Sequence, residues 1–222
     1  MPVLDEEARI ARRLEELAVT PGIDEVIVVD GSSTDRTIAV ASAFPGVRVL
    51  SASRGRGPQM NAGAATASGA ILLFLHADVS LPRDAVAWIA RALTDPGVVA
   101  GAFRTWTVPD AGQSWLAPLL HLADMRSRIT RFPYGDQAIF VRREAFERAG
   151  GFPDQPLMED LELSRRLRRL GRVVTVPAVV HVSGRRFLDR PIRSTLVNRL
   201  LPILYRLGVP PRVLAQLYGD VR

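Results

Sequence analysis

Hydrophobic residues occur along the chain in short unbroken runs separated by longer segments of mixed character. The runs are rich in β-branched residues, which is typical of strands buried on both faces. None approaches the roughly 20 apolar residues of a membrane-spanning helix. Strands are predicted at 25–30, 47–50, 70–75, 98–108 and 137–141, and an extended segment at 172–182.

Between these runs, apolar residues recur three or four positions apart, which is the spacing of one helix face. Ile10, Leu14 and Leu17 show this spacing among Glu and Arg residues. Strands that alternate with helices predict an α/β fold around a mostly parallel sheet with right-handed crossovers. Helices are predicted at 5–18, within 31–44 and 53–69, from Pro82, at 114–129, 142–151 and 158–171, and in a basic tail from Pro191.

Composition narrows the classes of protein that fit. The chain has 222 residues and no Cys, so it suits one α/β domain, with or without an extension, and excludes disulfides and thiolate metal sites. All 29 basic residues are Arg, the net charge is +6, and the guanidinium fork binds phosphate in bidentate fashion. The arginines fall mostly at helical spacings beside carboxylates, without interleaved aromatics, so no nucleic-acid partner is expected.

The start of the chain has no charged segment followed by a long apolar run, so no signal peptide is expected. We therefore expect a cytoplasmic protein, either soluble or peripheral at the inner face of the membrane. The basic tail would lie on an anionic membrane in the second case. Alternatively, it would pack on the domain as a helical lid or a dimer contact.

Polar residues with metal-binding or hydrogen-bonding side chains follow two predicted strands directly. Asp30 ends one strand, and His76 and Asp78 end another. In open parallel sheets, ligands bind beyond the carboxyl ends of the strands. A carboxylate there would contact a nucleobase or ribose, or would bind a hard cation. The alternative is that each Asp only caps a turn or helix.

Two further segments carry candidate chemistry. Arg54 and Arg56 alternate with glycines before a predicted helix start, where backbone N–H groups favour an anion. The segment lacks the Gly-Lys-Ser/Thr ending of a P-loop. Glu159 and Asp160 fall in the first turn of another predicted helix. They complement the helix dipole there, or one acts as a general base; spacing does not decide between these roles.

Five motifs, in this order, resemble those of family 2 glycosyltransferases, which are inverting enzymes with the GT-A fold. The resemblance runs from Pro2 to about Arg186 and implies a GT-A domain at 1–186 followed by a helical extension at 187–222. The finer pattern is similar to the radical-SAM/selenodomain-associated transferase 2 subgroup. The motifs are "PVLDEE", "VVDGSSTDRT", "RGRGPQMNAGAATASG", "LFLHADV" and "GDQAIFVRREAFERAGGF…MEDLELSRRLRRLG".

The resemblance implies a role for each matching residue. Asp160 would deprotonate the acceptor hydroxyl with support from Glu159, and Asp78 would bind Mg²⁺ or Mn²⁺, with His76 as a neighbouring donor or a Mn²⁺-tolerant ligand. Asp30 would bind the base of the nucleotide. Other nucleotide contacts would come from Asp5, Glu6, Arg54, Arg56 and Asn61. Arg185 and Arg186 would clamp the leaving diphosphate. The acceptor side of the site would be formed by Gly135, Asp136 and Gln137.

Three positions depart from the family pattern. The chain starts at "MPVLDEE", so the first strand is expected to be missing or truncated. Gly31 replaces the family's second Asp, which removes one base or ribose contact. His76 replaces the first Asp of the metal motif, and imidazole is a poorer partner than carboxylate for Mg²⁺.

The implied function is inverting, metal-dependent transfer of a sugar, of the hexosyltransferase type, from a nucleotide-diphosphate donor to a hydroxyl. The expected donor is a UDP-sugar, and lipid, carotenoid, polysaccharide and small-molecule acceptors all remain open. One alternative is a catalytically impaired GT-A-like protein that binds nucleotide sugars. Another is a sugar nucleotidyltransferase, although the Gly-rich signature with a Lys near the start is absent.

Overall fold

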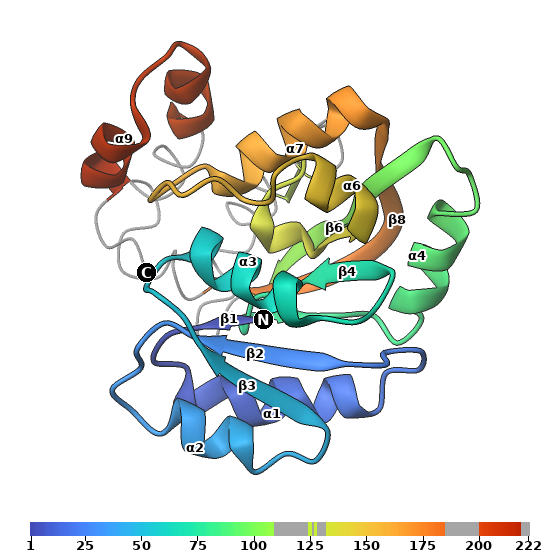
Figure 1. Ribbon diagram of the computed structural model, residues 1–222, viewed down its shortest axis with the longest axis vertical. Helices are drawn as coiled ribbons and strands as arrows, with labels where there is room; N and C mark the ends of the chain where they lie inside the picture. Colours follow the sequence, from blue (N-terminus) through green and yellow to red (C-terminus); the bar gives the residue numbers. More distant parts are fainter. Residues whose placement is uncertain (109–123, 126, 128–131, 185–199, 219–222) are drawn as a thin grey trace.

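Two sheets and the helices around them form the framework of the molecule (Figure 1). The computed structural model describes residues 1–108, 124, 125, 127, 132–184 and 200–218. The first sheet has the order β1-β2-β3, and both of its pairings are parallel. Its strands are β1 (Pro2–Val3), β2 (Val26–Asp30) and β3 (Val47–Ser51).

The second sheet is mixed and has the order β4-β7-β6-β8-β5. Only β6 and β8 pair in parallel, because β7 lies antiparallel between β4 and β6, and β5 runs antiparallel to β8. The α/β prediction is confirmed, but a mostly parallel arrangement holds only for the first sheet, since an apolar run does not encode strand direction. The strands are β4 (Ile71–Phe74), β5 (Val79–Ser80), β6 (Val98–Val108), β7 (Ile139–Arg142) and β8 (Arg172–Ser183).

Helices cover both faces of the first sheet (Figure 1). The helices α1 (Glu7–Ala18) and α2 (Thr37–Ser42) lie on one face, and α3 (Arg56–Thr66) lies on the other. Helix α1 buries the predicted apolar stripe of Ile10, Leu14 and Leu17. Helix α3 packs closely on β2: a Cβ added at Gly63 would lie 3.1 Å from Cγ2 of Val29.

The remaining helices surround the second sheet and the end of the chain. Helix α4 (Ala85–Ala92) starts three residues after Pro82, not at Pro82, and the Ala85 N–H donates to the Pro82 carbonyl at 3.0 Å. Residues 200–206 are also helical. The predicted helix at 114–129 lies almost wholly outside the described residues. The other helices are α6 (Arg143–Arg148), α7 (Glu159–Leu170), which ends at Gly171 as predicted, and α9 (Pro211–Tyr218).

Two local differences from prediction bear on the site. The predicted strand at 137–141 begins only at Ile139, because Gly135–Gln137 forms a 3-10 turn, η2. The first strand is two residues long, and its pairing with β2 includes a hydrogen bond from the Val29 N–H to the Met1 carbonyl at 2.8 Å. The ends of β1 and β2 therefore lie side by side below α3.

A small hydrophobic cluster joins the C-terminal helices to the body of the protein. Leu201 and Leu214 are buried against Tyr134, Met158 and Leu161. These contacts fix the C-terminal helices beside η2 and the start of α7.

Candidate active site

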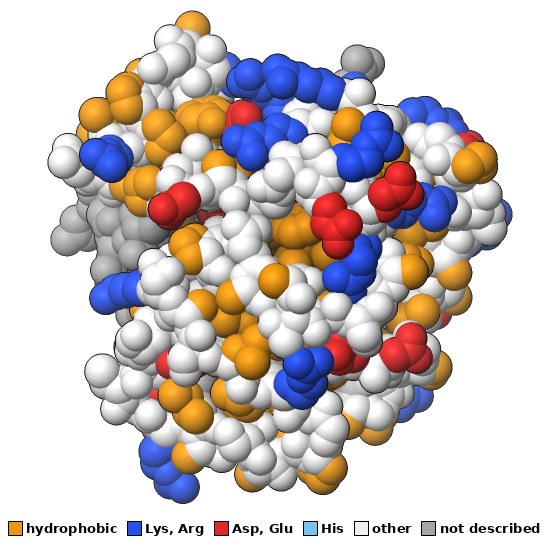
Figure 2. Space-filling view, viewed as in Figure 1, with side chains coloured by type: hydrophobic (Ala, Val, Ile, Leu, Met, Phe, Trp, Pro, Cys, Tyr) orange, Lys and Arg blue, Asp and Glu red, His pale blue; other side chains and the backbone are white. Residues whose placement is uncertain are grey.

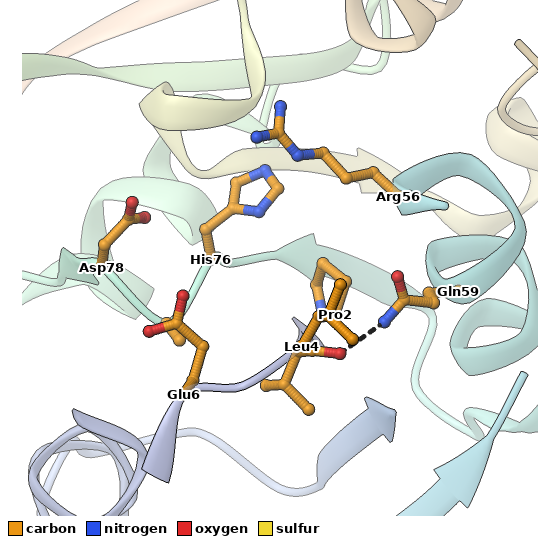
Figure 3. A pocket seen from close by; sticks show the side chains of 9 residues that line it. Pro2, Leu4, Glu6, Arg56, Gln59, His76 and Asp78 are labelled. Carbon is orange, nitrogen blue, oxygen red and sulfur yellow. Dashed lines mark hydrogen bonds between the residues drawn. The ribbon is translucent and has the colours of Figure 1, made fainter. Parts of the chain in front are cut away.

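A cleft lies between the β1–α1 loop, the start of α3 and the turn that connects β4 to β5 (Figure 3). It holds about 400 Å³ of empty space, part of which is open to solvent. Both sheets contribute to it, so residues far apart in the sequence face one another. The lining residues are Pro2, Val3, Leu4, Glu6, Arg56, Gln59, His76, Ala77 and Asp78.

The turn that carries His76 and Asp78 is held by backbone hydrogen bonds. The Val79 N–H donates to the His76 carbonyl at 3.1 Å, and the Ser183 N–H donates to the Asp78 carbonyl at 3.0 Å. The guanidinium of Arg13, from α1, reaches the Ala77 carbonyl at 3.4 Å. The abrupt end of the β4 run therefore presents His76 and Asp78 to the cleft on a braced turn (Figure 3).

Gly135 connects this turn to the candidate base. Its N–H donates to Oδ2 of Asp160 at 2.6 Å. A Cβ added at Gly135 would lie 2.6 Å from Nε2 of His76 and 3.5 Å from Oδ2 of Asp160. The backbone of Gly135 thus lies between the imidazole and the carboxylate, and any side chain at this position would enter the space between them. The turn that carries His76 and Asp78 and the start of α7 therefore meet at Gly135.

The backbone near Asp160 is held in uncommon conformations. Ala138, which follows η2, has φ 49°, and Met158, which precedes α7, has φ 67°. A non-glycine residue in this region costs on the order of 1–3 kcal/mol. The Leu161 N–H donates to Oδ1 of Asp160 at 2.7 Å. The Asp160 carboxylate is therefore oriented by two backbone donors at a helix entrance.

Glu159 is a buried carboxyl group beside Asp160, and only 4 % of it is exposed. Burial, followed by the charge of Asp160, raises its pKa from 4.5 to about 7, while the nearby Arg56 guanidinium acts in the opposite direction. Arg56 also lines the cleft, where its side chain extends toward His76 (Figure 3). Arg56 is thus close to both Glu159 and the turn that carries His76 and Asp78.

The raised pKa of Glu159 predicts how stability depends on pH. Between about pH 4.5 and about pH 7 the folded protein holds a proton that the unfolded chain has released, so the free energy of unfolding falls as pH rises through this window. Glu159→Gln removes this contribution. We therefore compare the free energy of unfolding of variant and wild type, measured by urea unfolding at about pH 5 and at about pH 8. The variant-minus-wild-type difference should be more favourable to the variant at about pH 8 by on the order of 2 kcal/mol.

The control for this experiment is Glu147→Gln, at an exposed position of α6. Its stability difference from wild type should be the same at both pH values. An equally constant difference for Glu159→Gln would contradict the raised pKa.

Asp30 and Asp5 do not line the cleft; they shape the loop after β2. The Asp30 carboxylate is 1 % exposed and accepts hydrogen bonds from the backbone N–H groups of Ser32 and Ser33, at 2.9 and 3.0 Å, and from the Ser33 hydroxyl. Oδ1 of Asp5 accepts the Thr34 N–H at 2.8 Å. The turn-capping alternative thus describes the Asp30 contacts in this structure.

Two other expected contact residues also brace backbone segments. Asn61 exchanges two hydrogen bonds with the backbone of Phe152, at 2.8 and 2.9 Å. Gln137 donates to the Phe103 carbonyl at 2.9 Å and accepts the Tyr134 N–H at 3.0 Å, which fixes η2 against β6. Neither side chain is among those that line the cleft.

The remaining expected site residues are spread more widely. Glu6 lines the cleft, and its carboxylate points toward the end of the cleft that holds Asp78 (Figure 3). Asp136 lies in η2, next to Gly135, and Arg54 is exposed outside the cleft. Arg185 and Arg186 lie outside the described residues.

Sequence reasoning did not single out Gln59, although it lines the cleft and is 3 % exposed. It falls inside the quoted "RGRGPQMNAGAATASG" motif, at the fourth residue of α3. The sequence carries no signal for it, because its burial comes from contacts with strands that are distant along the chain.

The donor atoms in the cleft suit a divalent cation that also binds a substrate. Among the described residues, no three His, Asp or Glu side chains are grouped closely enough to hold a metal ion by themselves. Mg²⁺ is commonly held by one or two carboxylates together with substrate phosphates, and imidazole is acceptable to Mn²⁺. Asp78, with His76 beside it, fits such a shared site and does not fit a structural metal cage.

Solved structures with the same fold include several glycosyltransferases. The mannosyltransferase PcManGT from Pyrobaculum calidifontis, in complex with GDP-Man and Mn²⁺, matches 98% of this chain and 66% of its own with a TM-score of 0.70 and 24% identity. Glucosyl-3-phosphoglycerate synthase from Mycobacterium tuberculosis, with Mn²⁺ and UDP-Glc, covers 94% of this chain and 78% of its own at a TM-score of 0.62 and 24% identity. These likenesses confirm the GT-A fold.

Similarity in sequence extends to curated relatives. Beta-monoglucosyldiacylglycerol synthase of Synechocystis is 28% identical over 196 residues, which is 78% of this chain and 41% of that protein. The probable glycosyltransferase YdaM of Bacillus subtilis is 27% identical over 171 residues, 66% of this chain and 40% of its own. The chain thus spans about two fifths of the length of the curated relatives it matches. Residues 1–150, more than half of the chain, match the model of Glycosyl transferase family 2, to which this protein belongs.

Proposed function

We propose that this chain transfers a sugar from a nucleotide-diphosphate donor to an acceptor hydroxyl, with inversion at the anomeric carbon and dependence on a divalent cation. The donor we favour is a UDP-sugar. One observation carries the proposal: Gly135 joins Asp160 to the His76–Asp78 turn, so the candidate base, which is not itself among the residues that line the cleft, lies close to a turn that lines it and carries the candidate metal ligand. Residues 1–186 would form the catalytic domain and 187–222 an extension, as in the subgroup proposed from the sequence.

The two ends of the reaction would be separated within the cleft. Asp160 would accept the proton of the acceptor hydroxyl as its oxygen bonds to the anomeric carbon. The bond from that carbon to the diphosphate oxygen would break, and its electron pair would leave with the nucleoside diphosphate. Arg56, at the N-terminus of α3, would stabilise the charge on the departing diphosphate.

A divalent cation would add to this charge stabilisation. Mn²⁺ or Mg²⁺ held by Asp78, with His76 beside it, would supply positive charge to the diphosphate. Glu6 would lie along the nucleotide, while Asp5, Asp30 and Asn61 would maintain the loops around it and Arg54 would add charge nearby. Arg185 and Arg186 remain our proposal for a clamp on the diphosphate, and Asp136 and Gln137 would shape the acceptor side. Relatives of the same fold support the donor class, because their structures hold GDP-Man, UDP-Glc or UDP-GlcNAc.

The direct test is nucleotide release from a panel of UDP-, GDP-, CDP- and ADP-sugars with Mn²⁺ and a mixture of lipid and saccharide acceptors. We expect release from at least one donor, and loss of that release with excess EDTA. A folded protein that neither binds nor turns over any donor in the panel would refute the proposal.

The C-terminal helices carry a surface that fits a lipid acceptor. We define the C-terminal apolar surface as Leu200, Ile203, Leu207, Val213 and Leu217, which are 43 % to 76 % exposed. Figure 2 shows hydrophobic side chains gathered at the upper left, over α9 and the helix at 200–206. Such a group of exposed large apolar residues indicates a contact surface.

The position of this surface relates it to the acceptor side. Leu201 and Leu214 hold the same helices against Tyr134 and Met158, the residues that precede Gly135 and Glu159. A membrane that contacted the surface would lie against helices that pack on the segments carrying Gly135 and Asp160. Arg206 and Arg212, on the same helices, would favour anionic headgroups.

We therefore propose peripheral binding to the inner face of an anionic membrane and a lipid acceptor. The relative named as a synthase of a glycosylated diacylglycerol supports this choice over carotenoid, polysaccharide and small-molecule acceptors. In the part of the chain that the structure describes, no helix has the length and hydropathy needed to cross a bilayer.

Leu207→Glu should lower binding to phosphatidylglycerol vesicles by about tenfold, because one apolar contact is lost and a negative charge is added. The measurement is vesicle flotation, and the control is Val19→Glu, which changes a residue that is 66 % exposed after α1. Equal flotation of both variants and the wild type would contradict the membrane proposal.

A further inference from the structure

The side chain of Gln59 links α3 to the ends of the first two strands. Its Nε2 group donates to the Val3 carbonyl at 2.8 Å and to the Val29 carbonyl at 2.8 Å. Both hydrogens of the amide nitrogen are thereby used. The two strands and the helix together fix the position of the whole carboxamide.

These contacts decide which way the amide points. Two backbone carbonyls can accept only from the NH₂ group, so the carbonyl oxygen Oε1 must face the other side. In Figure 3 this oxygen points away from the hydrogen-bonded β1 carbonyl, on the side of the cleft. The described residues provide no donor to this oxygen, and it is not one of their buried atoms that lack a partner, so it remains accessible from the cleft. A ligand N–H can therefore donate to it.

Gly31 makes room for this arrangement. A Cβ added at Gly31 would lie 2.9 Å from Oε1 and 3.0 Å from Cδ and Nε2 of Gln59. The Gly31 N–H also donates to the Val3 carbonyl at 3.0 Å, so its backbone cannot move away without breaking the β1–β2 contact. Glycine at position 31 and glutamine at position 59 therefore form one unit.

We propose that Oε1 of Gln59 accepts a hydrogen bond from a ring N–H of the donor's nucleobase and so sets base specificity. The proposal rests on the proposed function and adds the chemistry of base recognition to it. Gln59, Pro2 and Leu4 lie at one end of the cleft and Asp78 at the other, so the base and the diphosphate would occupy opposite ends (Figure 3).

The locked amide offers an acceptor and no donor to the base. Uracil and guanine carry a ring N–H on the edge used for pairing, whereas cytosine and adenine present a ring nitrogen acceptor there. Two acceptors facing each other leave a buried lone pair unsatisfied, which is the situation that gives strong discrimination. Uracil and guanine nucleotides should bind, and cytosine and adenine nucleotides should be rejected.

Calorimetric titration with UDP, GDP, CDP and ADP in the presence of Mn²⁺ tests this proposal. We expect wild type to bind either UDP or GDP, whose bases carry a ring N–H, with an affinity about tenfold or more above that for CDP and ADP. Gln59→Leu should reduce that preference to about threefold or less and should leave binding of inorganic pyrophosphate unchanged. Gln216→Leu, at an exposed position of α9, is the matched control and should keep the wild-type preference.

A second pair of variants separates recognition from a structural role of Gln59. Gly31→Ala keeps Gln59 but displaces its carboxamide, and it should lower the preference as Gln59→Leu does, even if Gln59→Leu fails to fold. The double variant Gly31→Asp with Gln59→Ala should restore the preference, because a carboxylate at position 31 would enter the space vacated by the amide.

The outcomes distinguish this proposal from the one it rests on. If the preference survives both Gln59→Leu and Gly31→Ala, Gln59 does not recognise the base, while nucleotide binding itself stands. If wild type binds neither nucleotide nor pyrophosphate, the proposed function fails.

Discussion

Asp160→Asn is expected to reduce the turnover number for sugar transfer by about 10²–10⁴-fold, because the amide cannot take the proton of the acceptor hydroxyl. The donor KM should change little, since the side chain keeps its size and its oxygen can still accept the Gly135 N–H. A loss confined to turnover is the pattern of a group that acts in the transition state. The measurement is steady-state nucleotide release at saturating donor.

The control for Asp160→Asn is Asp154→Asn, an exposed carboxylate in the segment before α7. It should retain wild-type turnover. If Asp160→Asn also stays within about threefold of wild type, Asp160 is not the base. A wild-type protein that binds donors but never turns them over would instead favour the catalytically impaired alternative.

Asp78→Asn is expected to weaken Mn²⁺-dependent UDP binding by about 100-fold or more. Loss of a residue that only supports a metal ligand costs about 10–100-fold in affinity, so loss of a ligand itself should reach at least the upper end of that range. Without metal, wild type and variant should bind UDP equally weakly. The measurement is calorimetric titration of UDP with Mn²⁺ and, separately, with EDTA.

Asp24→Asn, at an exposed position before β2, is the comparison variant for Asp78→Asn and should retain wild-type affinity. If Asp78→Asn retains the same dependence on Mn²⁺ as wild type, the metal binds elsewhere. His76→Ala, tested in the same way, would then show whether the imidazole is the ligand.

Local patterns were sufficient to predict most elements, including the two that carry the candidate metal ligand and the candidate base. The apolar stripe of α1 and the strand ahead of His76 follow from spacing within a few residues, and so does the helix entrance at Glu159. The proximity of Asp160 to the turn that carries His76 and Asp78 does not follow from local patterns. It depends on the 3-10 turn at Gly135 and on the antiparallel insertion of β7, and both are set by pairing between distant segments.

The contacts of Asp30 and Gln59 also differ in whether they depend on local sequence or on distant segments. Asp followed by Gly-Ser-Ser is a turn sequence, so the sequence itself indicates turn capping as an alternative role for Asp30. The structure shows these capping contacts with Ser32 and Ser33. The sequence does not indicate the contacts of Gln59, because its partners Val3 and Val29 lie 56 and 30 residues away along the chain. A side chain whose partners are backbone carbonyls of other strands leaves no local pattern.

The most direct test of the central claim is the anomalous scattering of Mn²⁺ in crystals soaked with Mn²⁺ and UDP. The account predicts one Mn²⁺ bound by Asp78 and the diphosphate, within the cleft that Arg56, Gln59 and His76 line, and with Asp160 on the side of the missing sugar. A Mn²⁺ bound away from Asp78, or UDP bound outside this cleft, would contradict it.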